Sequence, residues 1–133
     1  MIRLPSCFFG VIMEPDRVRF ITHKGKPILL VDVSHCTAEE VQKISPLVPG
    51  YVTGEPKQSV LLLADFTGCK IDRNAAERMK QDMVFDRPHL KRAAWVGTEA
   101  IPKVLFDNMK TFSRREPVTF ATRDEALDWL VQD

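Results

Sequence analysis

Hydrophobic and polar positions follow two different periods along this chain. Short runs that are almost continuously apolar alternate with segments in which apolar residues recur every three or four positions. Runs of the first kind are typical of strands covered on both faces, whereas the second spacing predicts amphipathic helices. The alternation of the two predicts an α/β protein.

Six segments carry the strand pattern. Two of them, Pro27–Val33 and Ser59–Asp65, are almost wholly apolar and therefore indicate strands inside a sheet. Turn-forming residues at 14–16 and 23–26 predict tight connections between the first three strands. The expected strands are Cys7–Met13, Arg17–Thr22, Pro27–Val33, Ser59–Asp65, Lys91–Gly97 and Pro117–Ala121.

Four segments carry the helix pattern, and each follows a residue suited to cap a helix. In the first, Thr37 and Glu40 match a capping box, while Pro46 and Pro49 predict a kink or an early end. The expected helices follow Thr37, run from Asp72 to about Phe85, run from Thr98 to about Ser113, and follow Thr122, where a second capping box begins. The face of the third helix expected to point into the core contains Ile101, Val104, Leu105, Met109 and Phe112.

Strands separated by helices of this length imply parallel neighbours with right-handed crossovers, and the opening hairpins add antiparallel strands at one side. We therefore expect a single domain over residues 1–133, with a mixed sheet of five or six strands and about four helices. A chain of 133 residues can bury a sizeable core without metals or disulfides. The 19 basic and 18 acidic side chains nearly cancel, which argues against a nucleic-acid partner.

Apolar length and cysteine usage bear on where the protein works. No stretch approaches the roughly 18 to 20 apolar residues of a membrane helix, so we expect no transmembrane segment. The apolar run near the N-terminus is too short for a secretory signal. Cys7, Cys36 and Cys69 are odd in number and widely spaced, which suits a reducing compartment. We expect a cytoplasmic protein without a cofactor.

One candidate reactive group is Cys36. With His35 it lies between a predicted strand and a helix N-terminus, an arrangement similar to the phosphate loop of cysteine phosphatases. That chemistry needs an Arg six residues after the Cys, and Gln42 stands there instead. Carboxylates in the first helical turn would also repel a phosphate. These departures favour an ordinary loop, and an enzyme with Cys36 as nucleophile is kept as an alternative.

A second candidate is the segment Asp65–Cys69, which follows the clearest buried strand. The carboxyl ends of strands are where open α/β sheets place their sites. The segment resembles the phospho-aspartate loop of haloacid dehalogenases and P-type pumps, with Asp65 as a possible nucleophile. Those enzymes need a second acidic cluster to hold magnesium, and none is evident. A binding role for this loop is therefore favoured over catalysis.

Metal binding and anion binding have weaker support. The His and Cys residues share no close ligand spacing beyond the adjacent pair His35 and Cys36, and adjacent extended residues point to opposite sides. We therefore expect no metal site. Basic residues gather around the third helix, where they complement a helix dipole or form an anion-recognising face. They are Arg87, Lys91, Arg92, Lys103, Lys110, Arg114 and Arg115.

Four segments are similar to the SpoIIAA-like family, relatives of the anti-sigma-factor antagonist (STAS) domains. They are Gly25–Ser34, Ser59–Thr67, Lys110–Arg115 and Phe120–Leu130, and the resemblance spans about residues 10 to 131. It implies a mixed sheet packed against helices, a cytoplasmic bacterial or archaeal setting, and no established catalysis. Some members resemble the Sec14 lipid-carrier fold, which implies an apolar ligand.

The resemblance also bears on the Asp65–Cys69 segment. Regulated members of the family carry Asp-Ser-Ser/Thr-Gly there, and phosphorylation of the first Ser repels the partner. Asp65 and Gly68 match that motif and Thr67 takes the second hydroxyl position, but Phe66 replaces the phosphorylated Ser. The family's switch therefore cannot run in its usual form, and phosphorylation of Thr67 is a further alternative.

Together these observations predict a non-catalytic regulatory or binding module. It is expected to dock a protein partner or an apolar small molecule at Asp65, Phe66, Thr67 and Gly68, with Phe106. An aromatic residue in place of a polar one favours an apolar contact, and Phe66, Phe106 and Trp95 are expected to line a cleft between sheet and helices. For Trp95, core packing is the favoured interpretation. An exposed edge strand such as Cys7–Met13 leaves a homodimer possible.

Overall fold

A mixed five-stranded sheet forms the centre of the described molecule, with strand order β1-β2-β3-β4-β5. A computed structural model describes residues 17–110 and 117–132. The strands are β1 (Val18–His23), β2 (Lys26–Asp32), β3 (Val60–Asp65), β4 (Leu90–Val96) and β5 (Val118–Phe120). β1 runs antiparallel to β2, and the other neighbouring pairs are parallel. The α/β class and the mixed sheet are as predicted, whereas the expected strand Cys7–Met13 lies outside the described residues.

The β1–β2 hairpin has the tight turn that the sequence predicts. Lys24 and Gly25 both have positive φ angles, 50° and 81°, which is the backbone of a turn that matches the twist of paired strands. Glycine adopts this conformation without strain. The hairpin places β1 at the sheet edge and β2 beside β3.

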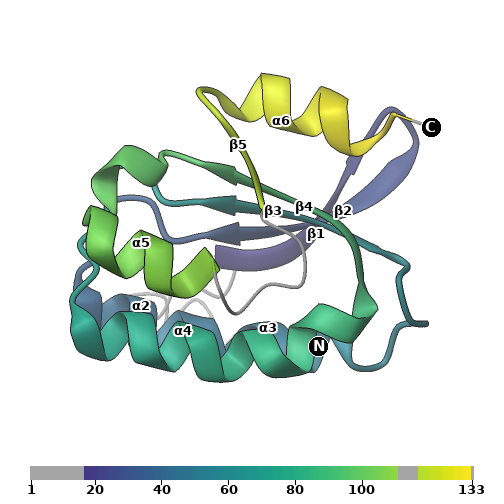
Figure 1. Ribbon diagram of the computed structural model, residues 1–133. Coiled ribbons are helices and arrows are strands. Elements are labelled where there is room, and N and C mark those ends of the chain that lie inside the picture. The colour runs from purple at the N-terminus through teal and green to yellow at the C-terminus, as the bar shows by residue number, and fades with distance from the viewer. Residues whose placement is uncertain (1–16, 111–116, 133) are drawn as a thin grey trace, which may run out of the picture.

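The helices divide unequally between the two faces of the sheet. α2 (Ala38–Ile44), α3 (Val48–Val52), α4 (Arg73–Asp86) and α5 (Lys103–Lys110) lie on one side, and α6 (Arg123–Leu130) lies on the other (Figure 1). The buried residues accordingly form two clusters. The larger is packed under α2–α5, and the smaller is packed under α6.

The first helical segment confirms its predicted cap and its predicted interruption. The backbone N–H of Glu40 donates to Oγ1 of Thr37, and the Glu40 carboxylate accepts from the Thr37 N–H, completing the capping box. α2 then gives way to a 3₁₀ helix, η2 (Ser45–Leu47), before α3 begins. Pro46 and Pro49 lie in the first turns of these two later pieces, where a missing N–H costs least.

The prediction of one helix from Thr98 to about Ser113 is wrong in its first part. Residues Thr98–Ala100 form a single 3₁₀ turn, η4, after Gly97 in the left-handed conformation. Ile101 is extended, with φ −91° and ψ 127°, because it precedes Pro102 and that ring excludes the helical region. α5 therefore begins at Lys103.

The apolar face predicted for that helix is also partly wrong. Val104 is 70% exposed rather than inward, whereas Ile101 and Met109 are buried and Leu105 is half-buried. The later start of α5 changes which of these positions share a helical face. Phe112 lies outside the described residues.

α6 closes the second face of the sheet. Its N-cap Thr122 accepts a hydrogen bond from the N–H of Glu125, as predicted. Ala126 and Leu130 are buried against the sheet, and Leu127 and Val131 pack at the margin of that cluster. α6 thereby brings Arg123, at its first turn, to the carboxyl end of the parallel strands.

Candidate functional site

Two short turns of the same design end the neighbouring strands β2 and β3. Asp32 and Asp65 are directly paired in the parallel register. Oδ1 of Asp32 accepts from the N–H and hydroxyl of Ser34, at 3.0 and 2.6 Å. Oδ1 of Asp65 accepts in the same way from Thr67, at 2.9 and 2.7 Å. The sequence Asp-x-Ser/Thr thus closes both turns through the aspartate side chain.

Arg123 joins the two turns. Its Nε donates to Oδ2 of Asp65 over 2.6 Å, and its Nη2 lies 3.1 Å from Oδ2 of Asp32. Burial alone would lower the pKa of Arg123, but its hydrogen bond to Asp65 and the charges of both aspartates raise it. Burial would likewise raise the pKa of Asp32, but hydrogen bonds from Ser34 and the charge of Arg123 lower it. Asp32 is therefore held ionised, and both carboxylates are bound within one structural network.

Two glycines fit the Asp65–Cys69 loop against its neighbours. A Cβ on Gly68, whose φ is +66°, would lie 2.5 Å from Nδ1 of His35. A Cβ on Gly97, whose φ is +74°, would clash with the backbone nitrogen of Thr67. The backbone N–H of His35 also donates to the carbonyl of Thr67 over 2.8 Å. Thr67 and Gly68 are thus fixed by packing as well as by hydrogen bonds.

The structure describes two cysteines, both buried: Cys69 ends this loop, and Cys36 lies beside it. The N–H of Lys70 donates to the carbonyl of Cys36, which joins the segments that carry Cys36 and Cys69. Burial raises the pKa of the Cys69 thiol to about 11, and the charges of Cys36 and Asp65 add to the rise. A nucleophilic thiol needs the opposite shift.

The rings of Phe66, Trp95 and Phe106 pack together. The ring centroids of Phe66 and Trp95 are 5.0 Å apart, and those of Trp95 and Phe106 are 5.8 Å apart. Phe66 is only 2% exposed, so it points inward from the loop rather than toward solvent. Asp65, Thr67 and Gly68 lie at the carboxyl end of the central strand β3, so the five predicted site residues divide into two groups.

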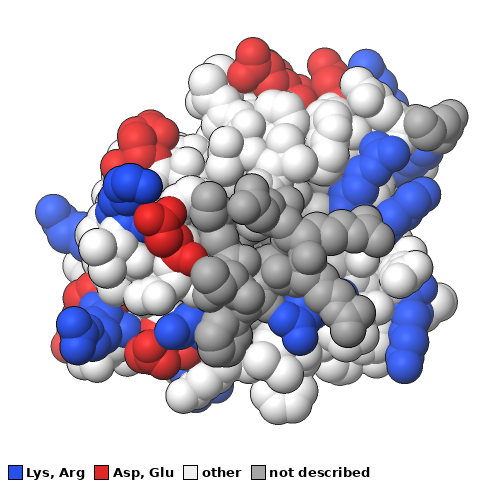
Figure 2. Space-filling view, in the orientation of Figure 1, with Lys and Arg blue, Asp and Glu red and all other residues white. Residues whose placement is uncertain are grey.

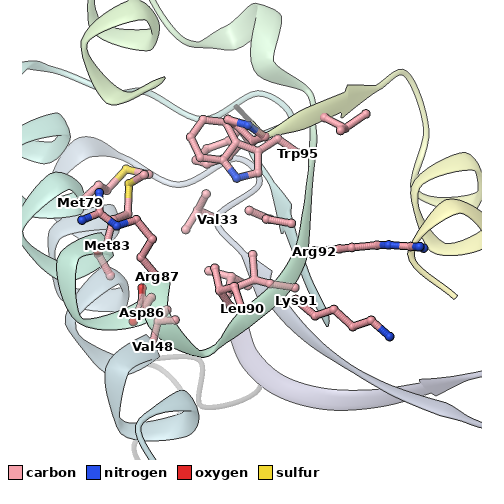
Figure 3. Close-up of a pocket in the computed structure, with 18 of the residues that line it drawn as sticks. Val33, Val48, Met79, Met83, Asp86, Arg87, Leu90, Lys91, Arg92 and Trp95 are labelled. Atoms are coloured by element: carbon pink, nitrogen blue, oxygen red, sulfur yellow. The ribbon is translucent and has the colours of Figure 1, made fainter. Parts of the chain in front are cut away.

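A cavity of about 480 Å³ opens between the sheet and helices α2–α4. One wall contains Val33, just after β2, and Leu62 and Ala64 of β3. Phe66 and Trp95 add aromatic surface to it. Opposite them, Met79 and Met83 extend from α4 toward Val33 and Trp95 (Figure 3). Flexible methionine side chains adapt to differently shaped apolar groups. Phe66 and Trp95 therefore line this cavity, whereas Phe106, which was expected in the same cleft, is not among its described lining residues.

Asp86 is a polar residue of this cavity that the sequence analysis missed. It is the last residue of α4, it lines the cavity and it is 6% exposed. Its Oδ1 has no hydrogen-bond partner among the described residues. Burial raises the pKa of Asp86 to about 7, and the nearby charge of Asp82 adds to the rise. An ionisable group of this kind in a cavity is typical of a functional position.

Two of the basic residues around the third predicted helix make contacts of their own rather than forming a shared anion-binding face. The Arg92 guanidinium donates to the carbonyls of Trp129 and Gln132 at the end of α6, and Lys103 pairs with Asp107. On the face that Figure 2 shows, several basic side chains lie on the right, and basic and acidic side chains are mixed on the left. Arg114 and Arg115 lie outside the described residues.

Neither a metal-binding cluster nor a membrane-spanning helix is found among the described residues. Over residues 17–110 and 117–132, no three His, Cys, Asp or Glu side chains are grouped to hold a metal ion. None of the helices in that part of the chain is long and apolar enough to span a bilayer.

Comparison with known proteins identifies the fold. No protein-family model and no curated protein matches the chain. Among solved structures, it is similar to an uncharacterized protein of the DUF3478 family from Shewanella loihica, which has a SpoIIAA-like fold. The two chains share 21% identity, with a TM-score of 0.66 over 85% of this chain and 91% of the other. The chain therefore has a SpoIIAA-like fold, as the sequence analysis expects.

Proposed function

We propose that this protein is a non-catalytic binding module that holds an apolar small molecule in the cavity beside Phe66. The observation that carries the proposal is the cavity itself. Its volume of about 480 Å³ falls within the roughly 300 to 1,000 Å³ of small-molecule sites. Its walls are mainly aliphatic, aromatic and methionine side chains, with few polar groups. A regulatory role agrees with the SpoIIAA-like fold of the similar structure.

Burial of Phe66 favours a small molecule over a protein partner, the two alternatives that the sequence left open. A protein that docks on the outer surface of the loop would not contact a side chain that is 2% exposed. A small molecule inside the cavity would contact it directly. In this proposal the network of Arg123 and Asp65 is structural, because it holds the loop from which Phe66 points inward.

The enzyme alternative has less support from the site. Both carboxylate oxygens of Asp65 accept hydrogen bonds, from Thr67 and from Arg123, so neither is poised to attack a substrate. Cys36 is buried, and the pKa of its neighbour Cys69 is raised rather than lowered. These contacts support binding over catalysis.

The proposal is tested by titrating the protein with 1-octanol while observing the methyl groups of methionine by NMR. Met79 and Met83 line the cavity, and Met109 is a buried methionine of α5 that is not among the described lining residues. We expect saturable shifts at Met79 and Met83 and little change at Met109. Equal shifts at all three, or none, would contradict the proposal.

A blocking variant makes the test specific. Ala64 lies on the sheet floor of the cavity, so Ala64→Leu places extra side-chain volume inside it. Ala121 is exposed, so Ala121→Leu adds the same atoms elsewhere. We expect Ala64→Leu to abolish the octanol-induced shifts and Ala121→Leu to preserve them.

A further inference from the structure

Asp86 gives the cavity a preference for ligands that carry a hydrogen-bond donor, which its apolar walls alone would not give. Its neighbour Asp82 is also buried but is satisfied, because Ser45 donates to it over 2.7 Å and Arg78 donates to both of its oxygens. Oδ1 of Asp86 has no such donor among the described residues. A buried acceptor without a partner is costly, so a ligand that supplies a donor gains affinity there.

The charges around Asp86 favour a cation over an anion. Asp82 is the charged neighbour whose field raises the pKa of Asp86. Lys91 and Arg92 point away from Asp86 (Figure 3), and Arg92 is bound to carbonyls at the end of α6. Arg87, directly after Asp86, also lines this end of the cavity (Figure 3). The ionised Asp86 carboxylate itself attracts a positive group and repels a carboxylate.

We propose that the cavity selects an apolar molecule carrying one protonated amine, which donates a hydrogen bond to the carboxylate of Asp86. The apolar part then lies against Leu62, Phe66 and Met79, and the ammonium group lies at the end of α4. This inference rests on the proposed function, because it requires the cavity to be a ligand site. A bond between an ammonium group and a carboxylate is stronger than one between neutral groups.

The affinity for such an amine depends on pH, because only ionised Asp86 forms the ion pair. An alkylamine stays protonated below pH 9, and the pKa of Asp86 is about 7. Lowering the pH from 8 to 6 should therefore weaken amine binding about tenfold. The other charged groups of α4 are Arg73, Glu77, Arg78, Lys80 and Asp82. Those of the described cavity lining are Arg87 on the 3₁₀ helix η3 (Arg87–His89), and Lys91 and Arg92 on β4. The described lining residues of β2, β3, α2 and α3 are uncharged.

Three ligands with the same tail test the inference by calorimetry: n-octylamine, 1-octanol and octanoate. At pH 8 we expect the amine to bind at least about tenfold more tightly than the alcohol, and octanoate to bind most weakly. Asp86→Asn should remove that advantage, while its affinity for 1-octanol changes by less than about threefold. Glu77→Gln removes a charge from an exposed position of the same helix and should leave all three affinities unchanged.

The outcomes separate this inference from the proposed function. Equal binding of amine and alcohol, or strongest binding of octanoate, overturns the role of Asp86 and leaves the cavity as an apolar site. Failure of all three ligands to bind contradicts both proposals. If Asp86→Asn does not fold, the wild-type protein still decides: amine affinity must fall about tenfold from pH 8 to pH 6 while octanol affinity stays constant.

Discussion

Arg123 donates a hydrogen bond to Asp65 over 2.6 Å, although the two residues lie 58 positions apart. The contact joins the first turn of α6 to the carboxyl end of β3. Asp65 is buried, and this guanidinium is bonded directly to its carboxylate. The same guanidinium reaches Asp32, so one side chain fixes two strand ends and the helix that covers the second face of the sheet.

Removing this guanidinium should destabilise the fold. We expect Arg123→Ala to lower the free energy of unfolding by about 2 to 4 kcal/mol, because it leaves the buried charge of Asp65 without its partner. Urea denaturation at pH 7 measures the change. Lys103→Ala is the control, since its pair with Asp107 is exposed and should contribute at most about 0.5 kcal/mol. A loss for Arg123→Ala no larger than the control would show that the network is not structural.

Gly97 should be intolerant of a methyl group. Gly97→Ala combines a positive φ with a clash against the backbone of Thr67, so we expect a loss of about 2 kcal/mol or more. Gly50 lies within α3, and a Cβ there meets nothing within 4 Å. Gly50→Ala should therefore stabilise the protein by about 0.5 to 1 kcal/mol in the same denaturation experiment. Similar effects from the two substitutions would contradict this account of the loop.

Asp86 should make stability depend on pH. Its pKa rises from 3.8 to about 7 on folding, so the native state holds the proton more tightly than the unfolded chain does. Its contribution is therefore full below about pH 4 and is lost as the pH rises through 7. Relative to Asp86→Asn, the wild-type protein should lose about 2 to 3 kcal/mol of stability between pH 5 and pH 8. Urea denaturation at the two pH values measures this difference, and a constant difference would show that Asp86 is not perturbed.

The described cysteines should be unreactive in the native protein. Cys36 and Cys69 are buried, and the pKa of about 11 keeps the Cys69 thiol protonated at pH 8. Iodoacetamide at pH 8, followed by peptide mass analysis, should label both residues only after unfolding in urea. Rapid labelling of Cys36 in the folded protein would revive the enzyme alternative.

Local patterns in the sequence predicted local features well. The capping box at Thr37 and Glu40 depends on residues three positions apart, so it can be predicted from the local sequence alone. The prediction at Thr98 was wrong because Thr98 suits a helix N-cap, whereas the nearby Pro102 prevents a continuous helix from starting there. Pro102 holds Ile101 extended, so the local restriction on the backbone prevails over capping chemistry.

Residues whose roles depend on distant contacts could not be predicted in the same way. Phe66, Trp95 and Phe106 were expected to line one cleft. Phe106 contacts Trp95 but is not among the described lining residues of the cavity. Arg123 looked like an ordinary residue of a helix N-terminus. Asp86 looked like a polar residue near a helix end, and its burial depends on how α4 and β4 pack together. No periodicity along the chain carries that information.

Native mass spectrometry of the protein purified from the cells that make it tests the ligand site most directly. Our account predicts that the wild-type chain retains a small non-covalent ligand and that Ala64→Leu, purified in parallel, does not. Wild-type protein and variant that both appear only at the masses of their bare chains would contradict the assignment of the cavity as a binding site.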